Sequence, residues 1–120
     1  MIKNNFFSIP NLENVVFIGY SSQLNELIDI TKKLKLKSLF ITSADQAKNI
    51  KKKLEYKIFN KINNEFKNFI TSKFKIEKTI FISLGSRIIF SKDVIENFFK
   101  RNLVNFHNSR LPLDAGGGNM

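Results

Sequence analysis

The chain has no cysteine and no tryptophan, and its 120 residues include one histidine, two prolines and five glycines. Without cysteine, disulfide bonds and thiolate metal sites are excluded, and a single histidine argues against a zinc site. The absence of cysteine is compatible with a reducing cytoplasm, which is the compartment that we expect. No apolar run approaches the roughly 20 residues needed to cross a bilayer, and residues 1–10 do not resemble a signal peptide. We therefore expect no membrane association and no bound metal.

Acidic residues are also scarce relative to basic ones. Ten aspartates and glutamates stand against 20 lysines and arginines, which gives a formal net charge of +10. A protein with this much net positive charge can attract nucleic acid or an anionic small molecule. Only Arg87, Arg101 and Arg110 are arginine, the residue type that binds bases and phosphates through paired hydrogen bonds. We interpret most of the lysines as the solvated surface of helices.

Hydrophobic residues make up 42% of the chain, and their spacing alternates between two periods. Short apolar runs predict buried strands at residues 15–18, 38–42, 56–59, 79–84 and 103–106. Between them, apolar residues recur at helical spacing at residues 24–34, 43–53, 62–74 and 91–99, with serines available as caps. Strands that alternate with helices predict an α/β domain, a Rossmann-like three-layer sandwich with a mostly parallel sheet.

The scarce residue types gather where this architecture binds ligands. In parallel α/β sheets, ligands bind beyond the carboxyl ends of the strands. The loops expected there are residues 19–22, residues 85–90 and the segment from Asn105 onward. Residues 105–120 hold the single histidine, one of the two prolines and three of the five glycines.

Asn105 and His107 have side chains suited to catalysis. Residues two apart in a strand point to the same face, so this amide and imidazole would project together, with Phe106 turned into the core. Histidine transfers protons near neutral pH, and an asparagine amide can stabilise a carbonyl oxygen that becomes an oxyanion. The pair suggests acyl-type transfer. On residue types alone a structural role stays open, because a single histidine at a strand end is more often a hydrogen-bonding residue than a catalyst.

Other common site motifs are missing. Gly19-Tyr20-Ser21-Ser22 has neither the Gly-Lys-Ser/Thr ending of a P-loop nor the later glycines of a dinucleotide-binding fingerprint. Ser109 lacks the glycines of a nucleophile elbow. We therefore expect no covalent enzyme intermediate.

The segment Asn105-Phe106-His107-Asn108-Ser109-Arg110-Leu111-Pro112, followed by Gly116-Gly117-Gly118, resembles a known family motif. It is similar to the Asn-x-His-x-Ser-x-Leu-Pro motif with downstream glycine of the folate-dependent formyltransferase superfamily. That superfamily includes methionyl-tRNA, glycinamide ribonucleotide and amino-sugar formyltransferases, and its Rossmann-like catalytic domain has a similar order of strands and helices. The resemblance implies that Asn105 orients and polarises the formyl group. It implies that His107 assists proton transfer and stabilises the tetrahedral intermediate.

The resemblance also implies binding loops for both substrates, and no metal. The loop that holds the pterin ring of the co-substrate, 10-formyltetrahydrofolate, would consist of Leu84, Gly85, Ser86, Arg87, Ile88, Ile89 and Phe90. A turn after a strand would explain Gly85 almost as well. The residues implied to contact the acceptor are Gly19, Tyr20, Ser21, Ser109, Gly116 and Gly117.

The expected reaction is transfer of the formyl group to a primary amine of a small molecule, such as a nucleotide-linked amino sugar. About thirteen residues precede the first predicted strand, and Ser109-Arg110-Leu111-Pro112 stands where methionyl-tRNA enzymes tend to have Ser-Leu-Leu-Pro. Both differences favour a small acceptor, whereas the charge of +10 favours tRNA. A methionyl-tRNA formyltransferase and a formyltetrahydrofolate hydrolase are therefore alternatives. An alternative of another class is a non-catalytic basic module that binds nucleic acid or a partner.

The family's third catalytic residue is an aspartate several tens of residues beyond the motif, whereas this sequence stops at Met120 within the glycine loop. The resemblance therefore implies that residues 1–120 are an N-terminal catalytic-domain fragment, with a sheet that is incomplete at the C-terminus and has an unpaired edge. We expect this polypeptide alone to be inactive in formyl transfer. The acceptor's identity and the oligomeric state stay open.

Overall fold

The computed structural model describes residues 11–50 and 55–106, which form a five-stranded sheet. The strands are β1 Asn14–Gly19, β2 Lys37–Thr42, β3 Lys57–Ile58, β4 Thr79–Leu84 and β5 Leu103–Phe106. Their order across the sheet is β3-β2-β1-β4-β5, and every neighbouring pair is parallel. The predicted α/β, Rossmann-like fold is confirmed.

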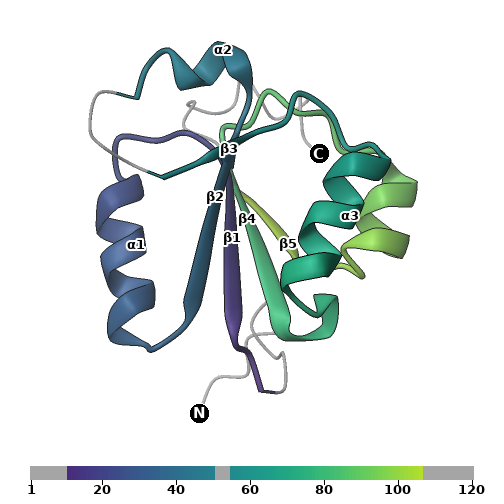
Figure 1. The fold of residues 1–120 in the computed structure, drawn as a ribbon, viewed down its shortest axis with the longest axis horizontal. Helices are drawn as coiled ribbons and strands as arrows, with labels where there is room; N and C mark the ends of the chain where they lie inside the picture. Colours follow the sequence, from purple (N-terminus) through teal and green to yellow (C-terminus); the bar gives the residue numbers. More distant parts are fainter. Residues whose placement is uncertain (1–10, 51–54, 107–120) are drawn as a thin grey trace.

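Helices cover both faces of this sheet (Figure 1). The helices on the faces are α1 Leu24–Lys33, α3 Asn64–Lys73 and the π-helix Val94–Phe98, with a 3-10 turn at Ile76–Lys78. The short α2 Ala44–Ala47 lies beyond the carboxyl ends of the strands. α1 covers one face as the chain passes outward from β1 to β2, and α3 covers the other as it returns from β3 to β4. The chain moves outward across the sheet at the first of these crossovers and back toward the centre at the second. Because the two directions are opposite, helices on opposite faces give both crossovers the same hand.

Two hydrophobic cores follow from the alternation of side chains along the strands. On one face, Val16 and Phe81 pack with Phe66 of α3. On the other face, Val15 and Phe17 belong to the core that includes Leu24 of α1. β1 is buried along its whole length, which explains why it reads as an unbroken apolar run.

Two predictions about helix ends were wrong. α1 was expected to have a serine cap, but its N-cap is Gln23, whose side chain makes no capping hydrogen bond. The Ser21 hydroxyl instead accepts a hydrogen bond from the backbone N–H of Gln23, at 3.1 Å. α2 begins after Ser43 as predicted, but it ends at Ala47 and not near residue 53. This segment buries only Gln46 against the rest of the protein, and a helix with so little packing gains little from further turns.

Candidate functional site

The carboxyl ends of β1, β4 and β5 lie side by side, because their pairing register aligns them (Figure 1). Gly19 pairs with Leu84, Leu84 pairs with Phe106, and Ser83 pairs with Asn105. The register therefore brings three predicted parts together: the start of the acceptor loop, the start of the folate loop, and Asn105. The strand order reverses between β1 and β4, and such switch points are where open α/β sheets bind ligands.

At Gly19 the end of β1 closely approaches the end of β4 and the loop that follows it. The φ angle of Gly19 is +109°, which L-residues rarely adopt. A Cβ atom on Gly19 would lie 2.5 Å from the carbonyl oxygen of Leu84 and 3.0 Å from the Cα of Ser86. The backbone N–H of Tyr20 donates a hydrogen bond to the same carbonyl, at 3.0 Å. The contact between these loops thus requires glycine here, whatever the site binds.

The predicted folate loop, residues 84–90, is anchored by its apolar side chains. Leu84 and Ile88 are buried, and the ring of Phe90 packs edge-on against Phe99, with 5.8 Å between the ring centroids. The Ser86 hydroxyl accepts a hydrogen bond from the backbone N–H of Ile88, at 2.9 Å. Between these anchors, the side chain of Ile89 is 85% exposed. The loop therefore presents a large apolar side chain to solvent on a backbone held from both sides.

The Gln46 side chain joins α2 to this loop. Its Nε2 donates a hydrogen bond to the carbonyl oxygen of Gly85 at 2.9 Å, and its Oε1 accepts one from the backbone N–H of Arg87 at 3.3 Å. Oε1 also accepts from the Ser43 hydroxyl, at 3.5 Å. A salt bridge of 3.1 Å between Arg87 and Asp45, both exposed, spans the same gap. The contact of Gln46 with this distant loop was not predicted from the sequence.

Ser83 is a second polar residue that sequence reasoning missed. It is 1% exposed, and its hydroxyl has no hydrogen-bond partner among the residues that the structure describes. Ser83 lies next to Asn105 in the sheet, so the two residues share a face. A serine within the otherwise apolar end of β4 was the available signal.

Several predicted site residues lie outside the described residues: His107, Ser109, Gly116 and Gly117. The pairing of the His107 imidazole with the Asn105 amide therefore stays a prediction. Asn105 itself is exposed near the end of β5. Of the predicted acceptor-contacting residues, Gly19 and Ser21 are buried and Tyr20 is half-buried against the α1 core.

The described part of the site contains backbone groups of two glycine loops, the Asn105 amide and an exposed isoleucine. Across residues 11–50 and 55–106, no three histidine, aspartate or glutamate side chains gather in a way that would hold a metal ion. Within the same ranges, no helix combines the length and apolar character needed to cross a bilayer. The backbone groups and the exposed isoleucine of the site suit a ligand that is oriented by backbone hydrogen bonds and apolar contact.

The fold and its strand ends define an α/β protein of the Rossmann-like class, with a candidate site at the switch point between β1 and β4. Comparison of the chain with known protein families, curated proteins and solved structures finds no match.

Proposed function

We propose that the protein transfers a formyl group from 10-formyltetrahydrofolate to a primary amine of a small molecule, such as a nucleotide-linked amino sugar. The observation that carries the proposal is the register of β1, β4 and β5, in which Asn105 adjoins the strand end that leads into the 84–90 loop. The resemblance of residues 105–112 to the formyltransferase motif supplies the chemistry. A formyl donor held by the loop would thus lie near the amide that polarises it.

The 84–90 loop would bind the pterin ring of the donor. A pterin is flat, with hydrogen-bond donors and acceptors along its edge, and backbone N–H and C=O groups can match that pattern. Ile89 offers an apolar contact for one face of the ring. Gln46 would hold the loop in place by its hydrogen bonds to Gly85 and Arg87, so that the backbone need not reorganise when the ligand binds.

In this mechanism a neutral amine attacks the formyl carbon, and a C–N bond forms while the carbonyl oxygen becomes an oxyanion. The Asn105 amide donates a hydrogen bond to that oxyanion, and His107 assists transfer of the amine proton toward the leaving nitrogen. The tetrahedral intermediate then collapses, with cleavage of its bond to tetrahydrofolate. The protein contributes positioning and a preorganised electrostatic environment, and the reaction forms no covalent bond to the enzyme.

Binding of the donor tests the proposal on the 120-residue chain itself. We expect calorimetric titration with 10-formyltetrahydrofolate to give saturable binding, and Ile89→Ser to weaken it about 10-fold through lost apolar contact. Leu34→Ser is the matched control, because Leu34 is also exposed, at 63%, but lies at the opposite end of the sheet. Absence of binding at millimolar donor, or equal loss in both variants, would contradict the proposed role of the loop.

Assays with different acceptors, on a form of the protein that transfers formyl groups, separate the alternatives. Release of formate without any amine would identify hydrolysis of the donor by water. Formylation of methionyl-tRNA would identify the larger acceptor. The proposal expects folate binding and formylation of an amino sugar. It expects neither release of formate without an amine nor formylation of methionyl-tRNA.

A further inference from the structure

The amino ends of the strands form a surface at the opposite end of the sheet from the candidate site (Figure 1). It is built from three segments that lead from a helix into a strand: residues 34–36, 74–78 and 100–102. The backbone N–H of Lys37 donates to the carbonyl of Glu13, and the N–H of Glu13 donates to the carbonyl of Lys78, both at 2.9 Å. The Asn102 amide donates to the carbonyl of Ile76 at 3.2 Å. The segments are thus joined into one surface, which we call the amino-end face.

The amino-end face is positively charged. Six basic side chains belong to its segments or directly follow one of them: Lys35, Lys37, Lys75, Lys78, Lys100 and Arg101. Three of them form salt bridges of 3.3–3.5 Å: Lys78 with Glu13, Lys100 with Glu77 and Arg101 with Glu96. The other three are exposed and form no salt bridge with the described residues. The pKa of Glu77 is lowered by a backbone hydrogen bond and by Lys100 and Lys75, as expected for a carboxylate in positive surroundings.

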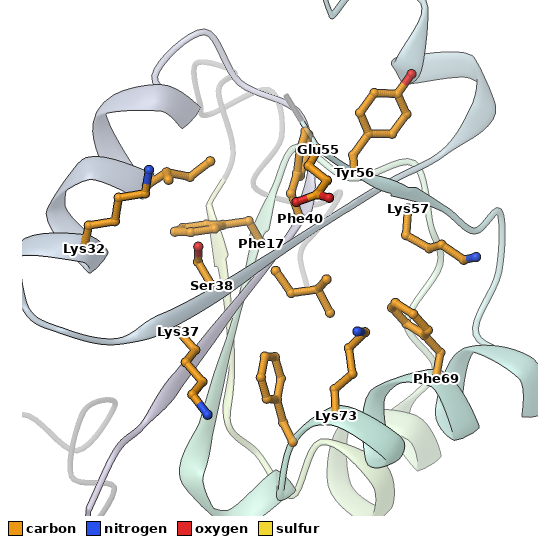
Figure 2. Close-up of a pocket in the computed structure, with 13 residues that line it drawn as sticks. Phe17, Lys32, Lys37, Ser38, Phe40, Glu55, Tyr56, Lys57, Phe69 and Lys73 are labelled. Atoms are coloured by element: carbon orange, nitrogen blue, oxygen red, sulfur yellow. The ribbon is translucent and has the colours of Figure 1, made fainter. Parts of the chain in front are cut away.

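Positive charge continues from this face along the side of the sheet. Lys37 and Lys73, the last residue of α3, line a groove of about 780 Å³ together with Lys32 of α1 (Figure 2). Glu55 lines the same groove and is its one acidic residue among the described part of the chain. A ligand with many negative charges that binds at the amino-end face would therefore meet further lysines beside it.

The residue types at left-handed backbone positions differ between the two ends of the sheet. At the carboxyl ends, Gly19 and Gly85 have φ angles of 109° and 57°. At the amino-end face, Lys35, Lys100 and Arg101 have φ angles of 61°, 52° and 64°. An L-residue bears a steric cost in this conformation that glycine does not. The chain thus places basic residues where glycine would be more stable.

Lys35 shows this most clearly. It follows Leu34, the C-cap residue of α1, and the backbone N–H of Leu36 donates to the carbonyl of Thr31 at 2.9 Å. This hydrogen bond is typical of a helix end that has glycine at the position of Lys35. A lysine that served only as solvated surface would not require a strained position. Strain that is retained in this way indicates a function for the charge itself.

We propose that the amino-end face binds the phosphate backbone of duplex nucleic acid without reading its sequence. Lysines on several neighbouring turns match a polyanion whose charges are closely and regularly spaced. Arg101, the one arginine of the face, already pairs with Glu96, so the face offers no free arginine for paired hydrogen bonds to a base. Phe74, the aromatic residue of these segments, packs against the core and offers no ring on which unpaired bases could stack. The inference does not depend on formyl transfer, because the two sites lie at opposite ends of the sheet.

An anionic bilayer also carries phosphates, but this face has little apolar surface to insert into it. Within the three segments, all of which the structure describes, Leu34 is the one exposed large apolar side chain, at 63%. Attachment of a protein surface to a bilayer scales with the apolar area that it inserts, in addition to its charge. A duplex requires no apolar contact and fits this face better.

Fluorescence anisotropy with a short labelled duplex tests the proposal on the 120-residue protein. We expect saturable binding at about 50 mM salt. Replacement of Lys35, Lys37 and Lys75 together by glutamine should lower the affinity at least about 10-fold. The slope of log affinity against log salt should become shallower by about 3, because each lost lysine removes one phosphate contact.

A matched triple variant controls for net charge. Lys48, Lys61 and Lys92 are exposed and form no salt bridge with the described residues. They lie near the carboxyl ends of the strands, in segments that precede α3 or the π-helix or directly follow α2. Their replacement by glutamine also lowers the formal net charge of +10 by three, but the affinity should stay within about twofold of the unsubstituted protein. Equal losses in the two triple variants would mean that net charge alone drives binding, which would contradict a site at the amino-end face.

Lys35→Gly separates the charge from the backbone strain. We expect it to raise the midpoint of urea unfolding, because glycine relieves the left-handed conformation. It should at the same time weaken duplex binding about threefold, because the charge is lost. A more stable variant with unchanged duplex affinity would show that Lys35 is not retained for binding.

Two further results would overturn the proposal. One is the absence of saturable duplex binding at about 50 mM salt. The other is binding to vesicles of phosphatidylserine and phosphatidylcholine that is tighter than duplex binding and is lost in the variant of Lys35, Lys37 and Lys75. That result would assign the face to a bilayer.

Discussion

The side chain of Gln46 connects helix α2 to Gly85, which lies 39 residues further along the sequence in the 84–90 loop. Both of its polar atoms bond to the backbone of the 84–90 loop, so its removal leaves a carbonyl at Gly85 and an N–H at Arg87 without their partner. Gln46→Leu keeps the volume of the side chain but not these bonds. We expect it to lower the free energy of unfolding by about 1–3 kcal/mol and to speed hydrogen exchange at the Arg87 amide.

Urea denaturation and amide exchange measure these two effects. Gln23→Leu is the matched control, because Gln23 is an exposed glutamine at the start of α1 whose side chain makes no capping hydrogen bond. Equal behaviour of the two variants would mean that Gln46 does not hold the loop.

Asn105 is the single residue of the described part of the chain on which the proposed catalysis depends. In a form of the protein that transfers formyl groups, Asn105→Ala should lower kcat on the order of 100- to 1,000-fold, the usual cost of losing an oxyanion donor. Because the amide acts mainly on the transition state, affinity for the donor should change far less. Asn68→Ala, at an exposed asparagine on α3, should leave kcat unchanged. A kcat for Asn105→Ala within about threefold of the unsubstituted protein would remove this residue from the mechanism.

At the scale of elements, the sequence predicted strands better than helix ends. β4 and β5 have the predicted bounds, because an apolar run between polar residues leaves little choice of where the strand begins and ends. Helix ends depend on individual hydrogen bonds: Asn63 begins α3 by accepting from the N–H of Phe66 at 2.9 Å, a cap that apolar spacing does not reveal. The predicted helix after Ser91 is largely a π-helix, whose wider turn also leaves no mark in the spacing.

That π-helix places two consecutive phenylalanines at the packing interface with α3. Phe99 is fully buried and its ring lies 4.5 Å from the Phe81 ring and 6.3 Å from the Phe66 ring, whereas Phe98 is half-buried. Phe99→Ala should therefore destabilise the protein by about 3–5 kcal/mol, through lost burial and a cavity between β4 and α3. Phe98→Ala should cost about half as much, since solvent already reaches that ring. Chemical denaturation measures both, and equal losses would show that the core does not centre on Phe99.

For the whole molecule, the alternation of strands and helices along the chain was the most useful pattern in the sequence. The alternation of strands and helices predicted which loops share an end of the sheet, and the observed register places the loops after β1 and β4 there together with Asn105. Side chains that act between elements, such as Gln46 and Ser83, could not be predicted, because their partners depend on how the elements pack.

The net charge of +10 is also a property of the whole molecule, and salt dependence tests what it contributes. If the lysines form a nucleic-acid-binding surface, affinity should fall steeply with salt because each phosphate contact releases counterions. If the protein contacts about four phosphates, a rise in salt from 50 to 200 mM should weaken duplex binding roughly 100-fold.

Folate binding at the strand ends should weaken less than about 10-fold over the same range, because the ligand has few charges and the pterin is held by uncharged groups. Anisotropy titrations with a labelled duplex and a labelled folate, on the same protein sample, give the two slopes directly. A steep slope for the duplex, with no saturable folate binding at any salt concentration, would favour the basic module over the formyltransferase. Folate binding that persists at 200 mM salt and depends only weakly on salt would instead locate the affinity in the loops. The excess lysines on the helix faces would then be solvated surface.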